Sequence, residues 1–144
     1  MKQVFAIDVG GVLANKQHEG EAIAGALEAV KKLYASFRLE IVSQCGAKRA
    51  ADTPRWLQNA GFSPYLAAQT YIGFKKRKTP VLAKIGARYF IDDRLKHVIP
   101  AATADKALTV FWLSQDQRAE LPAKLSNVIK VKSWDEVMKW LETP

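Results

Sequence analysis

The sequence has few of the features that stabilise a secreted or membrane-embedded protein. Its 144 residues include one cysteine, Cys45, so no disulfide can form within the chain. Asp, Lys or Gly interrupts the apolar runs within about 8 positions, far short of the roughly 20 residues that cross a bilayer. The N-terminal segment MKQVFAIDVGG lacks the basic, apolar and small-residue regions of a secretory signal. We therefore expect a cytoplasmic protein that does not enter a membrane.

Acidic residues are also scarce relative to basic ones. The 22 Lys and Arg outnumber the 14 Asp and Glu, which gives a net charge of +8. This balance favours anionic partners: phosphorylated small molecules, nucleotides, nucleic acids and acidic surfaces all stay open, as does a basic surface that is simply solvated. The expected assembly is a monomer or a small homo-oligomer.

The apolar residues follow an alternating pattern of strands and helices, and at 49% of the sequence they suffice for one domain over residues 1–144. Strands are expected at residues 3–8, 38–43, 70–74, 88–92, 107–113 and 127–131. Helices are expected at 20–36, at 48–61 or from Thr53 before Pro54, at 80–86 after a Thr79 cap, and at 134–142 after a Ser133 and Glu136 capping box. The alternation predicts an α/β fold, with a doubly wound, Rossmann-like parallel sheet flanked by helices.

Polar residues gather where these predicted strands end. In open α/β sheets, ligands bind beyond the carboxyl ends of the strands. The residues expected at that edge are Asp8, Gly10 and Gly11 after the first strand, Ser43 and Gln44 after the second, Lys78 before the third helix, and Asp92 and Asp93 after the fourth strand.

These residue types suit phosphoryl transfer to a carboxylate. Asp8 can attack phosphorus if a divalent cation reduces the repulsion between the two anions. Magnesium prefers oxygen ligands, which Asp8 could supply together with Asp92 or Asp93. Lys78 would offset the charge of the phosphoryl group. Phosphate contacts are expected from Ser43, Gln44 and the backbone around Gly10, Gly11 and Gly46.

Four short segments carry these residues: DVGGV at 8–12, IVSQCG around Ser43, KTP at 78–80 and IDDR at 91–94. Their order resembles the four motifs of the haloacid dehalogenase-like (HAD) hydrolases over residues 3 to 113. The resemblance implies a Mg²⁺-dependent phosphotransferase core in which Asp8 becomes phosphorylated and the Gly10 carbonyl joins the metal ligands. The segments after Asp8 and Ser43 are too short for a large cap domain, so the chain looks most like small nucleotidase-like or polynucleotide phosphatase-like members.

One position departs from that family. Its phosphatases usually carry a second aspartate two residues after the nucleophile as general acid and base, and this chain has Gly10 there. General acid or base assistance is typically worth ~10²–10⁴ in rate. Two functions therefore stay open: a hydrolase of phosphomonoesters, such as a nucleotide or a polynucleotide end, or a weakly active or inactive phosphate- or nucleic-acid-binding regulatory protein.

Several assignments within the site have competitors. We expect Asp93 to bind the metal directly and Asp92 to orient a ligand or Lys78. Lys78 is preferred because it directly precedes Thr79 and Pro80, and its competitors are Lys75, Lys76 and Lys84.

Two further groups of residues have no assigned chemistry. The KKRK run at 75–78 is either a solvated face or a nucleic-acid patch beside the site. His18 and His97 share no spacing typical of zinc ligands, and we expect them at surface or capping positions.

Overall fold

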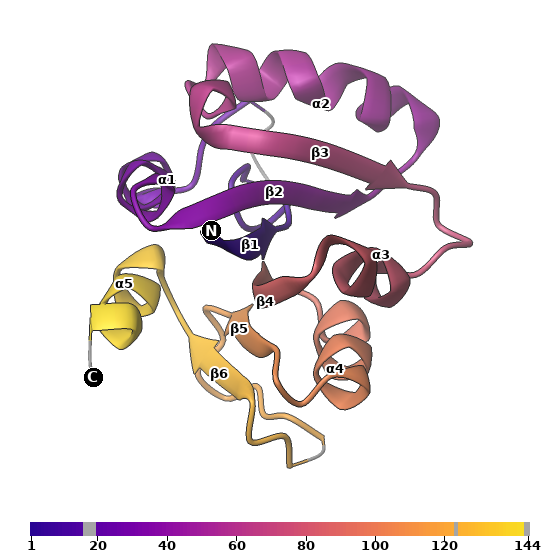
Figure 1. The fold of residues 1–144 in the computed structure, drawn as a ribbon, viewed down its shortest axis with the longest axis vertical. Helices are drawn as coiled ribbons and strands as arrows, with labels where there is room; N and C mark the ends of the chain where they lie inside the picture. Colours follow the sequence, from indigo (N-terminus) through magenta and orange to yellow (C-terminus); the bar gives the residue numbers. More distant parts are fainter. Residues whose placement is uncertain (16–19, 123, 143–144) are drawn as a thin grey trace.

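A parallel sheet of six strands forms the centre of the protein (Figure 1). The structure is a computed structural model that describes residues 1–15, 20–122 and 124–142, so His18 lies outside the described residues. The strands are β1 (Gln3–Ile7), β2 (Phe37–Gln44), β3 (Leu66–Ile72), β4 (Ala87–Asp92), β5 (Thr109–Leu113) and β6 (Val128–Val131). Their order is β3-β2-β1-β4-β5-β6, so the winding direction reverses between β1 and β4. The predicted doubly wound sheet is confirmed.

Helices cover both faces of this sheet. They are α1 (Ala26–Tyr34), α2 (Ala47–Asn59), α3 (Lys78–Ile85), α4 (Leu95–Ala104) and α5 (Trp134–Glu142), with a short 3-10 turn, η1, at Ser63–Tyr65. Buried side chains of α1, α2 and α5 belong to one core, and those of α3 and α4 to the other. Figure 1 shows α1 and α5 on one side of the sheet and α3 and α4 on the opposite side. In the described part of the chain, no helix is long and apolar enough to span a membrane.

Successive strand residues face opposite cores, because both faces of the sheet are covered. Phe5 and Ile7 pack in the core beneath α1 and α5, whereas Ala6 between them packs beneath α3 and α4. The same alternation holds in β4, where Ile91 belongs to the first core and Phe90 to the second. Burial on both faces thus explains the nearly continuous apolar runs and leaves the strand ends as the places for polar residues.

The connections after β1 and β2 are short. In its described part, the β1–α1 connection holds two isolated bridges, which pair Ala14 with Gly10 and with Ala22. Cys45 and Gly46 alone separate β2 from α2. The described residues therefore contain no cap domain over the sheet edge, as the sequence predicts.

Two helices begin at other residues than predicted. The helix expected at 20–36 begins at Ala26, because Gly25 adopts a left-handed conformation with φ 81° just before it. The helix expected from Pro80 begins at Lys78, with Arg77 rather than Thr79 in the N-cap position. Pro80 is then the third helical residue, where a backbone N–H has no partner within the helix, so its missing N–H costs no hydrogen bond.

Two other helices contain a proline in their interior. α2 runs through Pro54 without interruption, so the shorter alternative starting at Thr53 is wrong. α4, which contains Pro100, was not predicted. Val98 and Ala101 of α4 are buried against the sheet, and this packing offsets the helix-breaking tendency of proline.

The C-terminal helix α5 is fixed to the rest of the chain by its first residues. The Ser133 hydroxyl accepts a hydrogen bond from the Glu136 N–H at 3.3 Å, as predicted for a capping box. The Glu136 carboxylate accepts from the Lys132 N–H at 3.2 Å, one residue before the donor that the capping box uses. The buried Trp134 indole N–H donates to the Val12 carbonyl at 2.8 Å, which ties α5 to the loop that follows β1.

Candidate functional site

Three buried charged residues meet at the carboxyl edge of the sheet, where the winding direction reverses. Asp8 follows the last residue of β1, Asp92 ends β4, and Lys78 begins α3. The Asp8 N–H donates to the Ile91 carbonyl at 3.2 Å, so the two strand ends are held side by side. This is the position at which doubly wound sheets bind ligands.

Lys78 bridges the two carboxylates. Its Nζ lies 2.9 Å from Asp8 Oδ1 and 2.7 Å from Asp92 Oδ2, and its side chain is 2% exposed. The competing lysines Lys75, Lys76 and Lys84 are all exposed. The start of α3 at Lys78 explains the difference, because it turns this residue into the sheet edge while the preceding loop stays in solvent.

Asp8, Lys78 and Asp92 lie close enough together that their charges shift one another's pKa values. Burial raises the pKa of Asp8, and the Lys78 ammonium only partly opposes this effect. Burial and the neighbouring Asp8 charge raise the pKa of Asp92 to about 8. Burial favours a lower pKa for Lys78, but Asp8 and Asp92 outweigh it and raise the pKa above the usual value. A further cation beside the carboxylates would therefore be stabilised.

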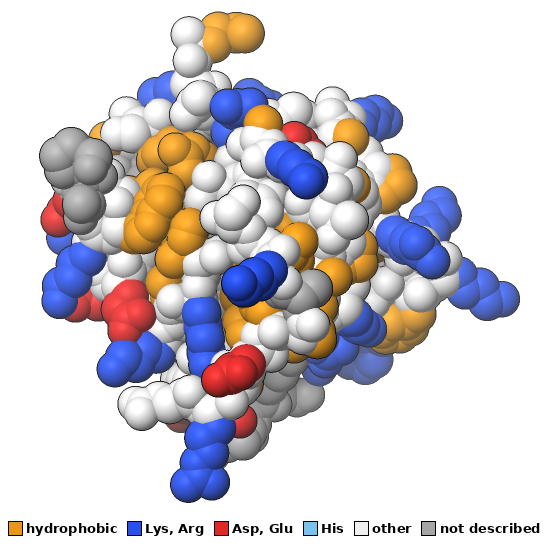
Figure 2. All heavy atoms as spheres, turned by 90° about the horizontal axis from the view of Figure 1, so that it is seen from below, with side chains coloured by type: hydrophobic (Ala, Val, Ile, Leu, Met, Phe, Trp, Pro, Cys, Tyr) orange, Lys and Arg blue, Asp and Glu red, His pale blue; other side chains and the backbone are white. Residues whose placement is uncertain are grey.

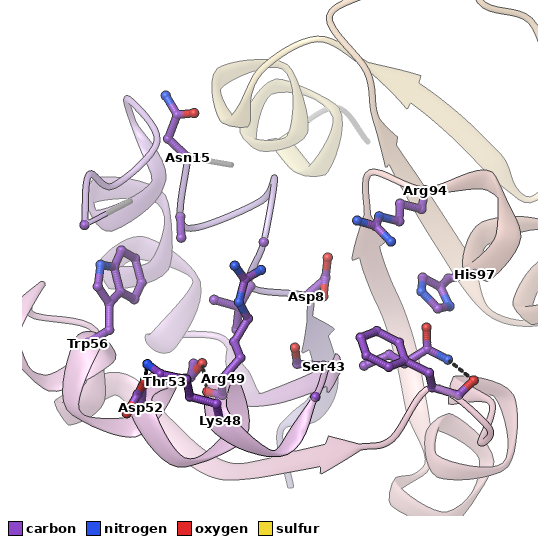
Figure 3. A pocket seen from close by; sticks show the side chains of 17 residues that line it. Asp8, Asn15, Ser43, Lys48, Arg49, Asp52, Thr53, Trp56, Arg94 and His97 are labelled. Carbon is purple, nitrogen blue, oxygen red and sulfur yellow. Dashed lines mark hydrogen bonds and ion pairs between the residues drawn. The ribbon is translucent and has the colours of Figure 1, made fainter. Parts of the chain in front are cut away.

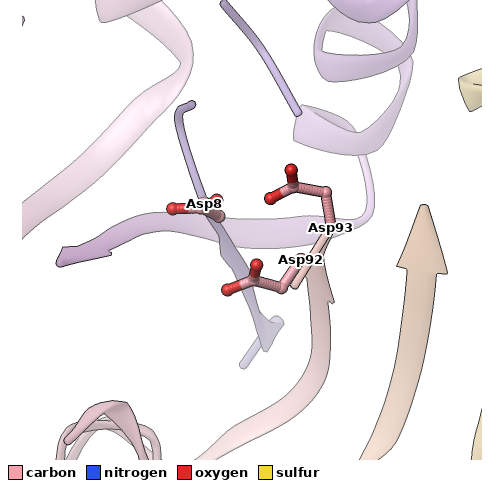
Figure 4. A group of neighbouring side chains, drawn as sticks. All are labelled: Asp8, Asp92 and Asp93. Atoms are coloured by element: carbon pink, nitrogen blue, oxygen red, sulfur yellow. The ribbon is translucent and has the colours of Figure 1, made fainter. Parts of the chain in front are cut away.

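Asp93 completes a cluster of three carboxylates with Asp8 and Asp92 (Figure 4). One oxygen from each lies within 4.8 Å of the others. Adjacent strand residues point to opposite faces, but Asp93 follows the last residue of β4 and escapes that constraint. Three carboxylate oxygens at this spacing fit a hard divalent cation such as Mg²⁺.

The two aspartates at the end of β4 have different surroundings. Both oxygens of Asp92 accept hydrogen bonds, Oδ2 from Lys78 at 2.7 Å and Oδ1 from the Arg94 N–H at 3.0 Å. Asp93 is half-buried, and its main-chain carbonyl accepts a hydrogen bond from the Trp112 indole at 3.3 Å. These contacts favour Asp92 as the residue that orients Lys78.

The residues expected to contact phosphate are brought near Asp8 to different degrees. Ser43 is buried at the end of β2 and lines the same pocket as Asp8, Gly10 and Gly46. Gly46 is the N-cap of α2, whose first turn presents backbone N–H groups that the helix itself does not use. Ser43 and this helix start therefore provide donors for an anion.

Gly11 and Gln44 have other partners. The Gly11 N–H donates to the Ala14 carbonyl at 2.8 Å, and its φ of 82° serves the turn after β1. The Gln44 amide nitrogen lies 2.8 Å from the Lys76 carbonyl and 3.5 Å from that of Phe74. The side chain of Gln44 therefore holds the β3–α3 loop, and the phosphate contacts expected of Gly11 and Gln44 stay predictions.

A pocket of about 620 Å³ opens beside these groups. In Figure 3, Asp8 and Ser43 lie between Arg49 and Trp56 on one side and Arg94 and His97 on the other. The described residues that line it are Asp8, Val9, Gly10, Ala14, Asn15, Gly20, Ser43, Gln44, Gly46, Lys48, Arg49, Asp52, Thr53, Trp56, Phe74, Arg94 and His97.

The prediction missed much of this lining. His97 is buried rather than at the surface, because α4 turns its first residues toward the pocket. Burial, Lys78 and two further cations lower the pKa of His97 to about 4. The pocket residues of α2 could have been found from the sequence, because this helix was predicted and it begins shortly after Ser43, at the ligand edge of the sheet.

The comparisons with known proteins point to one fold. No known protein family matches the sequence, and no curated protein matches it either. Among solved structures, a HAD phosphatase from Thermococcus onnurineus aligns with a TM-score of 0.74 and 11% identity, over 99% of this chain and 98% of that protein. A proposed haloacid dehalogenase-like hydrolase from Burkholderia xenovorans aligns with a TM-score of 0.72 and 14% identity, over 97% of this chain and 98% of that protein.

A third structure comes from a longer protein. It is a proposed HAD hydrolase from Bacillus subtilis with magnesium bound, and it aligns with a TM-score of 0.69 and 17% identity. The alignment covers 86% of this chain but 57% of the Bacillus protein. Together with the parallel sheet and its order, these alignments show that the chain has the fold of the haloacid dehalogenase-like hydrolases.

Proposed function

We propose that the chain is a Mg²⁺-dependent phosphohydrolase of the HAD-like superfamily, with Asp8 as the nucleophile toward a phosphomonoester. The observation that carries the proposal is the contact of Lys78 with both Asp8 and Asp92 beside a third carboxylate, Asp93. A buried lysine between carboxylates would serve stability poorly, because desolvation offsets most of the attraction. The cluster has a clearer purpose in binding a phosphate and its counterion.

The reaction proceeds in two displacements at phosphorus. An Asp8 carboxylate oxygen forms a bond to phosphorus while the bond to the ester oxygen breaks, and the leaving alcohol takes a proton from solvent. Water then attacks the aspartyl phosphate, the P–O bond to Asp8 breaks, and orthophosphate leaves. The Lys78 Nζ donates to Asp8 Oδ1 at 2.9 Å, and this hydrogen bond fixes the orientation of the Asp8 carboxylate for attack.

The carboxylate cluster would hold the metal through Asp8 and Asp93, with the Gly10 carbonyl as a further ligand. Bound Mg²⁺ would reduce the repulsion between the Asp8 carboxylate and the phosphate and favour ionised Asp8. Asp92 keeps Lys78 in place from the opposite side. Ser43 and the first backbone N–H groups of α2 would donate to the phosphoryl oxygens as their charge develops.

Gly10 supports a second candidate function. Without a carboxylate at this position, departure of the alcohol has no general acid from this loop, and turnover would be slow. Phosphate and metal binding do not require that group. A protein that binds phosphorylated ligands with little hydrolysis would use the same residues.

The test is release of orthophosphate from p-nitrophenyl phosphate in Mg²⁺ and in EDTA. We expect Mg²⁺-dependent release by the native chain, and loss of release in Asp8→Asn. Asp135→Asn is the matched control, because Asp135 is exposed on α5. Equal rates for the native chain and Asp8→Asn would refute the hydrolase. Absence of release combined with Mg²⁺-dependent orthophosphate binding by the native chain would favour the binding function.

A further inference from the structure

The pocket is larger than the proposed chemistry requires. Its volume of about 620 Å³ lies within the range of sites for whole cofactors and drug-sized ligands, whereas a phosphate alone is far smaller. Beyond the reacting groups, the lining includes two aromatic side chains, Trp56 and Phe74, and three cationic ones, Lys48, Arg49 and Arg94. This composition suits a leaving group that has planar rings and further negative charge.

Phe74 is an exposed aromatic residue on a fixed support. Its side chain is 68% exposed at the pocket, and a ring carbon lies 3.6 Å from where a β-carbon on Gly46 would stand. The Gln44 side-chain amide donates to the Phe74 and Lys76 main-chain carbonyls, and the Cys45 N–H donates to the Ile72 carbonyl at 2.9 Å. These bonds hold the backbone around Phe74 while its ring stays largely in solvent, so the ring gains little from packing and is available to stack on a planar ligand.

Three basic residues directly follow Phe74 in the β3–α3 loop beside the pocket. Three segments beyond the ends of β2, β3 and β4, at residues 46–49, 73–77 and 94–96, contain seven Lys or Arg. Each segment contributes at least one residue to the pocket lining, where Asp52 is also present. Lys75, Lys76 and Arg77 are all exposed. Figure 2 shows Lys and Arg side chains projecting at its right-hand edge, the side on which the β3–α3 loop lies in Figure 1. A small phosphomonoester would leave most of this charge unused.

We infer that the natural ligand is the phosphorylated end of a single-stranded nucleic acid, which is then the substrate class of the proposed hydrolase. The terminal phosphate lies at Asp8 and Ser43, the adjacent base stacks on Phe74, and the following phosphates meet the basic loop at 75–77. Aromatic platforms beside a cationic groove are how proteins bind single strands. A base in a duplex end is stacked and paired, whereas a single-stranded base is free to meet Phe74. In the hydrolytic step, the terminal nucleoside hydroxyl is the leaving group and takes a proton from solvent.

The experiment measures binding, so it does not depend on turnover. Fluorescence anisotropy in Mg²⁺ follows single-stranded octamers with an internal label that carry a 5′-phosphate, a 3′-phosphate or neither. We expect one phosphorylated octamer to bind at least about tenfold more tightly than the unphosphorylated octamer and, in competition, than a nucleoside monophosphate. Phe74→Leu keeps an apolar residue without the aromatic face and should weaken that binding at least about fivefold.

The charge contribution is tested by salt dependence. The double variant Lys75→Ala/Lys76→Ala should lower the slope of log Kd against log salt by about 1.4, since each phosphate contact with a single strand contributes about 0.7. Lys31→Ala/Lys32→Ala is the matched control: both lysines are exposed in the last turn of α1, which leads into the amino end of β2, away from the site. The control should keep the native slope.

The outcomes separate this inference from the proposed reaction. Equal affinity for phosphorylated and unphosphorylated octamers, or native affinity in Phe74→Leu, would overturn the nucleic-acid assignment even if p-nitrophenyl phosphate is hydrolysed. The expected binding pattern without phosphate release from any octamer would overturn the hydrolase and support the nucleic-acid surface. A mononucleotide that binds as tightly as the octamers would limit the ligand to a single nucleotide and refute the role of the basic loop.

Discussion

Replacing Lys78 with methionine tests the charge balance of the site most directly. The Lys78→Met variant keeps an unbranched side chain of similar length but removes the ammonium group that lies 2.9 Å from Asp8 and 2.7 Å from Asp92. Three carboxylates with oxygens within 4.8 Å of one another then remain without their buried cation.

The expected loss of stability is large for a chain of this size. Removing one partner of a buried ion pair costs about 3–5 kcal/mol, because the remaining charge stays desolvated. A whole domain is typically stable by about 5–15 kcal/mol. The loss should depend on pH, since protonation relieves the carboxylates. The pKa of Asp92 is already about 8 with Lys78 present, against 3.8 for an ordinary aspartate, and removal of Lys78 raises it further. A folded-state pKa above the unfolded value means that stability falls as pH rises between the two. The native chain and the variant bind different numbers of protons only above about pH 8, where Asp92 ionises in the native chain and stays protonated in the variant, so the loss should be greater at pH 9.5 than at pH 6.

Urea unfolding followed by circular dichroism measures this free energy at both pH values, in EDTA and in Mg²⁺. Mg²⁺ should restore part of the stability, by about 2.7 kcal/mol at a hundredfold excess over its Kd. Lys75→Met, three residues upstream and exposed, is the control and should change stability by less than about 0.5 kcal/mol. A loss below about 1 kcal/mol at pH 9.5, or the same loss at both pH values, would refute the reasoning.

Three other predictions concern the surroundings of the site. Gly10→Asp should raise kcat for p-nitrophenyl phosphate at least about tenfold, because it restores a general acid at a backbone position that, unlike Gly11 at φ 82°, is not left-handed; an unchanged kcat would argue against hydrolysis. The titration of His97 should make the protein less stable as pH falls from 6.5 toward 4, because the pKa of His97 is about 4 in the folded chain and the unfolded chain binds its proton first. Urea unfolding of His97→Gln should therefore show a flatter dependence of stability on pH. Trp134→Phe leaves the buried Val12 carbonyl without its donor and should cost about 1–3 kcal/mol in the same assay, while no loss would mean that water replaces the indole.

The sheet and its reacting edge follow from the sequence for a physical reason. Strands that are buried on both faces need continuous apolar runs, so the first polar residue after each run marks the edge where ligands bind. Asp8, Ser43 and Asp92 were located in this way. The pairing of Lys78 with both carboxylates follows from the start of α3, which the sequence placed two residues too late.

The wider pocket was less accessible to prediction. Helix surfaces that face a ligand carry polar residues, and these look the same in sequence as residues that face solvent. Lys48 and Arg49 are of this kind, and His97 lies on α4, a helix that was not predicted. Phe74 was placed at the end of a strand expected over 70–74, because its aromatic ring suits a strand; β3 ends at Ile72 instead and leaves Phe74 exposed in the loop that follows.

The hydrogen bond between Trp134 and Val12 also has a consequence for the order in which the site matures during synthesis. A ribosome makes Val12 long before Trp134, which lies 122 residues later in the chain. The loop that carries Asp8 and Gly10 therefore waits for the last helix before it reaches its final support. A nascent chain that does not yet include α5 would contain the residues of the carboxylate cluster but lack this anchor, and its loop after β1 should be less ordered until α5 has been made.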